Sequence, residues 1–221
     1  MSIDLPLIFA VLMGAAMLAY VLLDGYDLGV GMLMPAASEA EQDIMVASIG
    51  PFWDANETWL VLGIGLLLVA FPAAHGVILG ALYLPVVAML VGLMLRGVAF
   101  ELRVKAEGWH AELWNSLFWF GSFLAGMAQG FMLGRTVTGF EPGFGYLLFS
   151  LFVGAALCGG YVLLGATWLI ARTEDALQKK AFAWARWGLL WVALGVMLVS
   201  LATPLASETV RAKWFEFPRT L

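Results

Sequence analysis

Two aspartates three residues apart are the first side chains in this sequence whose type and spacing could move protons. Asp24 and Asp27 lie in the segment Asp-Gly-Tyr-Asp-Leu-Gly-Val-Gly, and a spacing of three places both carboxylates on one face of a helix. Ionisable groups in membrane helices are costly, and they mark ion paths, buried pairs or subunit contacts. The flanking glycines would allow another backbone to approach closely. The alternative interpretation is a solvated helix end.

A second polar cluster lies in the segment Gly-Pro-Phe-Trp-Asp-Ala-Asn-Glu-Thr-Trp, which occupies residues 50–59. The proline ends any preceding helix. Asp54 or Asn56 could cap the helix that follows, where acidic side chains also suit the helix dipole. Capping is therefore a complete structural explanation for Asp54, and proton relay is the sharper hypothesis. Trp53 and Glu57 are the other candidates in this segment.

A third cluster, Arg-Gly-Val-Ala-Phe-Glu-Leu-Arg, occupies residues 96–103. Arg96 could be the counter-ion of an aspartate in either of the other two clusters, because a nearby opposite charge favours the ionised form. Glu101 and Arg103 complete the candidates. A hydrogen-bonded set of acids with one arginine is what a proton uptake path requires, and a locked junction between helices requires the same set. The sequence leaves both functions open.

The residues that could hold a metal or haem are few. His75 and His110 are the only histidines, and Cys158 is the only cysteine. The two histidines are predicted on opposite sides of a membrane, so they could not jointly ligate one haem iron, which needs axial His, Met or Cys ligands. No phosphate-binding or dinucleotide-binding glycine motif is present. We therefore predict that this chain binds no cofactor or metal of its own.

The elements that must position these residues follow from composition. Of the 221 residues, 62% are hydrophobic and 12% are charged, whereas a soluble domain has about 45–50% apolar and about 25% charged residues. This excludes an ordinary soluble protein and a disordered one. The net charge of −5 and the pI near 4.9 also argue against binding to nucleic acid. The chain is predicted to lie in a lipid bilayer.

The predicted fold is all-α, a polytopic bundle of about six transmembrane helices, because about 20 apolar residues span a bilayer core. Lysine and arginine gather in the connections after the third and fifth segments, which the positive-inside rule assigns to the cytoplasm. The N-terminus is then outside, in the periplasm, and all three polar clusters meet on the cytoplasmic face. The expected segments are 6–23 with a helical continuation to 34, 57–71, 76–95 with a kink at Pro85, 113–133, 145–170 and 187–203.

The three clusters resemble the signature segments of subunit II of the cytochrome bd-type quinol oxidases. The stretch Gly-Ala-Thr-Trp-Leu at residues 165–169 is similar to a further segment of that family. The Gly-Pro-Phe-Trp form is similar to the cyanide-insensitive branch. Four spaced motifs in the expected order make the resemblance specific, whereas any one of them alone would be a weak signal.

The resemblance implies a heterodimer with a subunit I that carries the quinol site and the b-type and d-type haems, in a bacterial inner membrane. Such a complex oxidises quinol, reduces dioxygen to water and takes protons from the cytoplasm. Subunit II binds no haem, and a bound quinone and a small accessory subunit stay open. The residues that the resemblance assigns to assembly and to the proton path are Asp24, Asp27, Trp53, Asp54 and Arg96.

The resemblance also bears on domain organisation. Members of the family have eight helices in two four-helix halves, so residues 1–221 are interpreted as one membrane domain. Its first half covers about 1–135, and an incomplete second half covers about 143–221. The chain is then expected to be about two helices short at its C-terminal side.

Two functional alternatives stay open: an ion-coupled secondary transporter that uses the aspartates, and a purely structural membrane partner.

Overall fold

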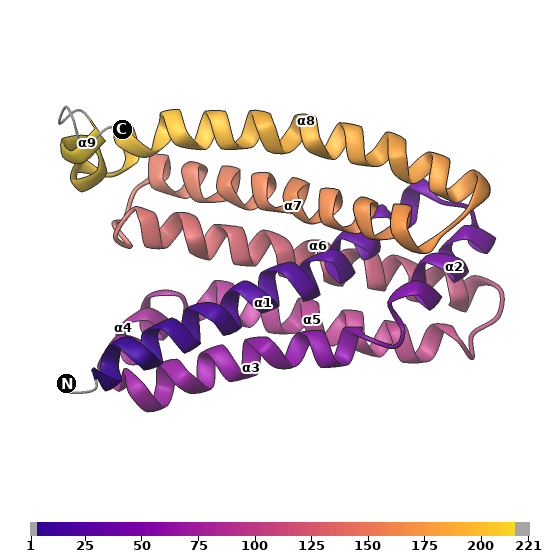
Figure 1. Cartoon of the computed structure of the whole chain (residues 1–221), viewed down its shortest axis with the longest axis horizontal. Coiled ribbons are helices and arrows are strands. Elements are labelled where there is room, and N and C mark those ends of the chain that lie inside the picture. Colours follow the sequence, from indigo (N-terminus) through magenta and orange to yellow (C-terminus); the bar gives the residue numbers. More distant parts are fainter. Residues whose placement is uncertain (1–3, 215–221) are drawn as a thin grey trace.

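The computed structural model describes residues 4–214, and every regular element in that range is a helix. The long helices run back and forth beside one another and form an elongated bundle (Figure 1). In chain order they are α1 (Leu5–Leu33), the short 3₁₀ helix η1 (Met34–Ala36), α2 (Glu39–Ile49), α3 (Trp53–Ala70), α4 (Pro72–Ala81), α5 (Tyr83–Arg103), α6 (Trp109–Val137), α7 (Phe144–Arg172), α8 (Asp175–Ala206) and α9 (Glu208–Trp214).

Six of these helices are long and apolar enough to cross a membrane, namely α1, α3, α5, α6, α7 and α8. This confirms the prediction of an all-helical membrane bundle. The helices extend beyond the apolar segments found in the sequence: α3 begins at Trp53 rather than 57, and α8 begins at Asp175 rather than 187. Hydropathy marks only the part of a helix inside the bilayer, whereas backbone hydrogen bonding continues into the polar flanks.

The expectation of one helix over 76–95 with a kink at Pro85 is wrong. The chain breaks at Leu82, between α4 and α5, and Pro85 is the third residue of α5. A proline is tolerated in the first turn of a helix, because the backbone N–H that it lacks would have no partner inside the helix there. Pro85 therefore helps to begin α5 instead of bending a longer helix.

The bundle has two ends with different contents. One end, called the α2 end here, holds α2, the start of α3, the α5–α6 connection and the α7–α8 connection (Figure 1). The other, the α4 end, holds α4, α9 and the start of α1. Between them α1 packs against α3, α6 and α7, while α5 packs on α6 and α8 packs on α7. The first half of α1 is largely exposed, whereas its second half, which carries the aspartates, is enclosed by neighbouring helices.

Two glycines bring α1 and α7 into backbone contact. A Cβ atom built on Gly29 would lie within 1.8 Å of the carbonyl oxygen of Tyr161, and one on Gly165 would lie 2.4 Å from the carbonyl carbon of Gly29. Neither position can hold a side chain unless the helices separate. The expectation that glycines beside the aspartates permit close approach is confirmed here. This crossing fixes the rotation of α1, and with it the direction in which Asp24 and Asp27 point.

Candidate functional site

Asp24 and Asp27 are both buried, with 1% and 0% of their surface exposed. Helix α1 continues to Leu33, so the two carboxylates lie inside the helix and not at its last turn. The interpretation of a solvated helix end is therefore wrong. A buried carboxylate needs an opposite charge or several hydrogen-bond donors, because an isolated one is far less stable than in water.

Arg96, on α5, supplies the opposite charge for Asp24. Its Nη2 lies 2.7 Å from Oδ1 of Asp24 and 3.1 Å from Oε2 of Glu57 on α3. The arginine is 1% exposed, like Asp24, whereas the Glu57 side chain is 30% exposed. One guanidinium thus joins a fully buried carboxylate to one that reaches the surface. The hypothesis that Arg96 is the counter-ion of an aspartate is confirmed, and the aspartate is Asp24. We call Asp24, Glu57 and Arg96 the ion-paired cluster.

Asp27 is held separately, by an amide. The Asn56 side-chain nitrogen donates to Oδ2 of Asp27 at 2.8 Å, and it lies 2.7 Å from the hydroxyl oxygen of Tyr26. Asn56 therefore joins α3 to α1 and does not cap α3. The capping residue of α3 is Phe52, and no side chain caps that helix. The hypothesis that Asp54 or Asn56 is the cap is wrong, because the helix begins before both residues.

Asp54 lies on the surface, in the first turn of α3. It is not part of the ion-paired cluster, but its charge acts on that of Glu57, three residues further along the same helix. Its side chain makes no hydrogen bond or ion pair with the residues that the structure describes. The carboxylates therefore become more buried in the order Asp54, Glu57, Asp24, starting from the surface at the α2 end.

Trp53 covers the arginine from one side. The centroid of its ring lies 6.0 Å from the guanidinium carbon of Arg96, at the outer limit for a cation–π contact. The ring also packs on Phe100, with 4.8 Å between the centroids. Trp53 is therefore placed to shield the arginine from solvent at the point where α3 and α5 meet.

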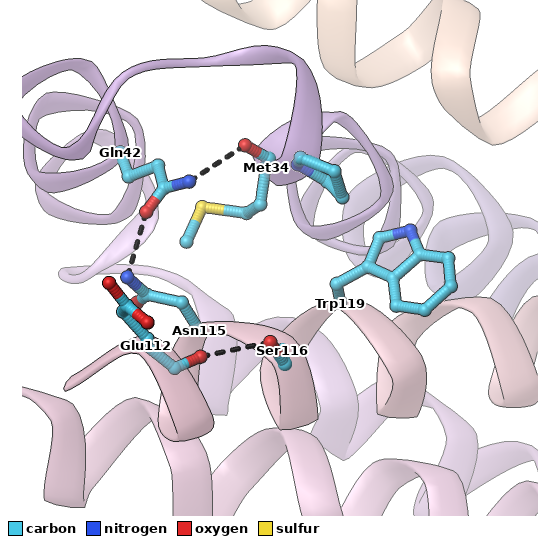
Figure 2. A pocket seen from close by; sticks show the side chains of 7 residues that line it. Met34, Gln42, Glu112, Asn115, Ser116 and Trp119 are labelled. Atoms are coloured by element: carbon cyan, nitrogen blue, oxygen red, sulfur yellow. Dashed lines mark hydrogen bonds between the residues drawn. The ribbon is translucent and has the colours of Figure 1, made fainter. Parts of the chain in front are cut away.

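Glu101 and Arg103 lie apart from this cluster. Glu101 is exposed. Arg103 pairs with Asp43 of α2 at 2.9 Å, and its Nε donates to Oδ1 of Asn115 at 2.8 Å. Asn115 in turn donates to Gln42, as Figure 2 shows beside a pocket of about 200 Å³. Arg103 thus fastens α2 to α5 and α6, and the structure does not bring the whole third segment to the ion-paired cluster.

Two tyrosines near the cluster, Tyr20 and Tyr26, are not among the candidates that the sequence suggests. Tyr20 could be found from its spacing, since it lies one helical turn before Asp24 on the same face. Tyr26 stacks on Trp168 with 4.0 Å between ring centroids, and the guanidinium of Arg172 lies 4.6 Å from that tryptophan ring. This stack gives the Gly-Ala-Thr-Trp-Leu segment a structural role: it packs α7 against the aspartate segment of α1.

The two histidines lie too far apart to ligate one haem iron together. His75 lies on α4 and His110 at the start of α6, at opposite ends of the bundle (Figure 1). His110 is exposed and lies against the neighbouring Trp109 ring, with 3.7 Å between centroids. Across residues 4–214, no three His, Cys, Asp or Glu side chains are grouped so that they could hold a metal ion.

A sequence model of a known protein family matches nearly the whole chain. The family is described as "Cytochrome bd terminal oxidase subunit II", and the match covers residues 5–218. All four polar or aromatic segments at the α2 end lie inside that range.

Three curated relatives illustrate the similarity of this chain to known proteins. Cytochrome bd-I ubiquinol oxidase subunit 2 of Escherichia coli K12 is 31% identical over 200 residues, which is 82% of this chain and 52% of that protein. Cytochrome bd ubiquinol oxidase subunit 2 of Bacillus subtilis is 39% identical over 118 residues, 52% of this chain and 35% of that protein. A probable cytochrome oxidase subunit 2 of Haemophilus influenzae is 30% identical over 195 residues, 80% of this chain and 51% of that protein. The chain spans about half the length, or less, of these relatives.

Proposed function

Because the chain belongs to the cytochrome bd terminal oxidase subunit II family, we propose that it works as part of a quinol oxidase in a bacterial membrane. In this proposal the complex oxidises quinol and reduces dioxygen to water. The family implies a subunit I partner and haems in the complex. We assign the quinol site and the haems to subunit I, in a heterodimer, as the sequence resemblance implies. The two histidines of this chain lie on α4 and at the start of α6, so they could not ligate one haem together.

The observation that carries a proton role is the graded burial of the three carboxylates. Asp54, on the surface, would collect protons and pass them to Glu57, which reaches both the surface and Arg96. A proton that arrives on Oε2 of Glu57 neutralises that carboxylate and removes its ion pair with Arg96. The arginine keeps its pair with Asp24 at 2.7 Å. An arginine with two carboxylates can thus exchange partners as one of them is protonated.

Spare hydrogen-bonding atoms support this exchange. Oδ1 of Asp27, and Nε and Nη1 of Arg96, are buried and have no hydrogen-bond partner among residues 4–214. Buried polar atoms are otherwise almost always satisfied, and exceptions need an explanation. Free donors and acceptors next to an ion pair are what a group needs if it is to change partners during proton transfer.

The direction of uptake depends on membrane orientation. The connections α5–α6 and α7–α8 both lie at the α2 end (Figure 1). Basic residues lie in the first connection and in the helix ends that flank the two connections, namely Arg103, Lys105, Arg172, Lys179 and Lys180. Positive residues favour the cytoplasmic side. We therefore propose that the α2 end faces the cytoplasm, that the N-terminus faces the periplasm, and that protons are taken up from the cytoplasm.

The transporter alternative has less support. Transporters place ion sites at broken helices near the middle of the membrane. The break in this chain is at Leu82, and Arg96 follows it by 14 residues, or about 21 Å along α5. The break is thus remote from the ion-paired cluster. A purely structural role is the remaining alternative, and it predicts that the carboxylates can be neutralised without loss of turnover.

The experiment that tests the assignment is co-expression with a subunit I from the same operon or genome. We expect a membrane complex that contains haem by absorbance and consumes oxygen with quinol, while this chain purified alone carries no stoichiometric haem. Haem bound stoichiometrically to the isolated chain would overturn the assignment of the haems to subunit I. Substrate flux into vesicles that contain only this chain would instead support a transporter.

A further inference from the structure

A chain of hydrogen bonds leads from α7 through α6 to α1, outside the ion-paired cluster. The hydroxyl of Tyr161 donates to Oε1 of Gln129, and Nε2 of Gln129 donates to the hydroxyl oxygen of Tyr20 at 2.7 Å. Both tyrosines are at most 2% exposed. Three helices thus contribute one polar side chain each, within an otherwise apolar part of the bundle.

Each hydrogen bond in this series is donated in the same direction, from α7 toward α1. Because the Gln129 amide already donates to the Tyr20 oxygen, the Tyr20 O–H is left to donate to a different acceptor. Asp24 lies one helical turn further along α1, close enough to interact with Tyr20 both electrostatically and through a side-chain hydrogen bond. Oδ2 of Asp24 is buried and lacks a hydrogen-bond partner within the described range. The free donor and the free acceptor are therefore neighbours.

We propose that Tyr20 donates to the Asp24 carboxylate, and that Tyr161, Gln129 and Tyr20 are positioning residues that keep this carboxylate facing Arg96. A hydrogen bond to the charged form of a carboxylate favours that form. The effect on the carboxylate stands on this geometry alone. Any effect on oxidase turnover rests on the proton role proposed above.

The Tyr161 ring packs against two glycines, which fix its position between the neighbouring helices. A Cβ atom on Gly25 of α1 would lie 2.8 Å from Cε1 of the Tyr161 ring, and one on Gly126 of α6 would lie 3.2 Å from Cδ2. Both neighbouring helices thus lack side chains where the ring enters. An alanine at Gly25 would clash with the ring and force it to shift, which would disturb the hydrogen bond of its hydroxyl to Gln129.

The series of hydrogen bonds from Tyr161 through Gln129 to Tyr20 positions the Asp24 carboxylate without conducting protons. A glutamine amide neither gains nor loses a proton near neutral pH, so it interrupts stepwise transfer between the two tyrosines. The proton path then stays on the Arg96 side of Asp24. The titratable or charged groups that act on Asp24 come from each helix around it: Tyr20 and Asp27 of α1, Glu57 of α3, Arg96 of α5 and Tyr161 of α7.

Infrared spectroscopy of the full chain in lipid nanodiscs tests the proposal. The antisymmetric stretching band of a buried carboxylate is assigned to Asp24 by its absence in Asp24→Asn. In Tyr20→Phe we expect this band to shift in frequency, because one hydrogen bond to the carboxylate is lost. Tyr83→Phe is the matched control, since Tyr83 is 66% exposed. An unchanged band in Tyr20→Phe would overturn the proposal.

Gln129→Leu is the second variant, and it keeps the proposal testable if Tyr20→Phe does not fold. It should shift the band in the same direction by a smaller amount, and Tyr161→Phe by less again, because each is one step further from Asp24. Equal shifts in all three, or none, would contradict the order of the chain. If the bands shift in this order while oxidase turnover is unaffected, the positioning role holds and the proton role fails.

Discussion

Two arginines on α5, seven residues apart, offer a direct comparison within the α2 end. Arg96 and Arg103 lie two turns apart on one side of the helix, and each contacts a carboxylate from another helix. The partner of Arg96 is buried like the arginine itself, whereas Asp43, the partner of Arg103, has 70% of its side chain exposed. The two pairs have similar distances, 2.7 and 2.9 Å. Burial therefore separates their energetics, because water screens the outer pair and not the inner one.

The largest effect is expected at the inner arginine. Arg96→Leu should lower the free energy of unfolding by about 3–5 kcal/mol, because it leaves Asp24 buried without a counter-charge. Thermal unfolding in detergent measures this, with Arg103→Leu as the matched control. The double variant Arg96→Leu/Asp24→Asn should recover part of the loss. A similar loss in both single variants would remove the distinction between the two pairs.

A smaller loss is expected at the amide that holds Asp27. Asn56→Leu should lower stability by about 1–3 kcal/mol, since Oδ2 of Asp27 loses its donor inside the bundle. The same unfolding assay measures it. Thr58→Val is the control, because Thr58 is exposed and bonds only to the backbone of its own helix. If the control is as harmful as Asn56→Leu, the contact between α3 and α1 has no special weight.

At the outer pair the effect should be small and dependent on salt. Asp43→Asn should cost about 0.2–1 kcal/mol at low ionic strength. The cost should nearly vanish at about 1 M salt, where the screening length is about 3 Å. Unfolding at two salt concentrations tests this, and Arg96→Leu should keep its cost in both. A cost at Asp43 that salt does not change would show that burial is the wrong criterion.

The smallest effect is expected at Glu41, and only above acidic pH. Lys180 and the backbone N–H and hydroxyl of Ser38 lower the pKa of the Glu41 carboxyl from 4.5 to about 2. A carboxyl whose pKa is lowered in the folded state stabilises the fold at pH values above its ordinary pKa. This contribution is lost as the pH falls through the lowered pKa. Glu41→Gln should therefore lower the melting temperature at pH 7, and the difference should shrink as the pH falls toward 2. Glu39→Gln is the control, and a difference independent of pH would contradict the contact with Lys180.

Much of the fold could be predicted from the sequence because the bilayer imposes one strong rule. Apolar stretches of sufficient length form helices, and the six segments found in this way correspond to α1, α3, α5, α6, α7 and α8. The break at Leu82 could not be predicted in the same way. Leu82 is as apolar as its neighbours, so hydropathy does not change there, and the nearby proline suggested a bend at the wrong residue.

The candidate site was predicted less completely, because side-chain partners depend on how helices rotate against one another. The spacing of Asp24 and Asp27 placed them on one face, but it could not show which of them meets Arg96. That choice follows from the crossing of α1 and α7 at Gly29 and Gly165, which are 136 residues apart in the sequence. The sequence likewise suggests Asn56 as one of two possible caps, since nothing local indicates that it faces α1.

Two glutamates at the α2 end give the most direct test of the proton role. Both were singled out from the sequence, but Glu57 contacts Arg96 whereas Glu101 is exposed and outside the cluster. In the complex with subunit I, oxygen consumption with quinol is measured for Glu57→Gln and Glu101→Gln at equal haem content. A proton role predicts that Glu57→Gln lowers turnover about tenfold or more, while Glu101→Gln leaves it unchanged. Equal turnover in the two variants would contradict that role and leave the cluster a structural junction between helices.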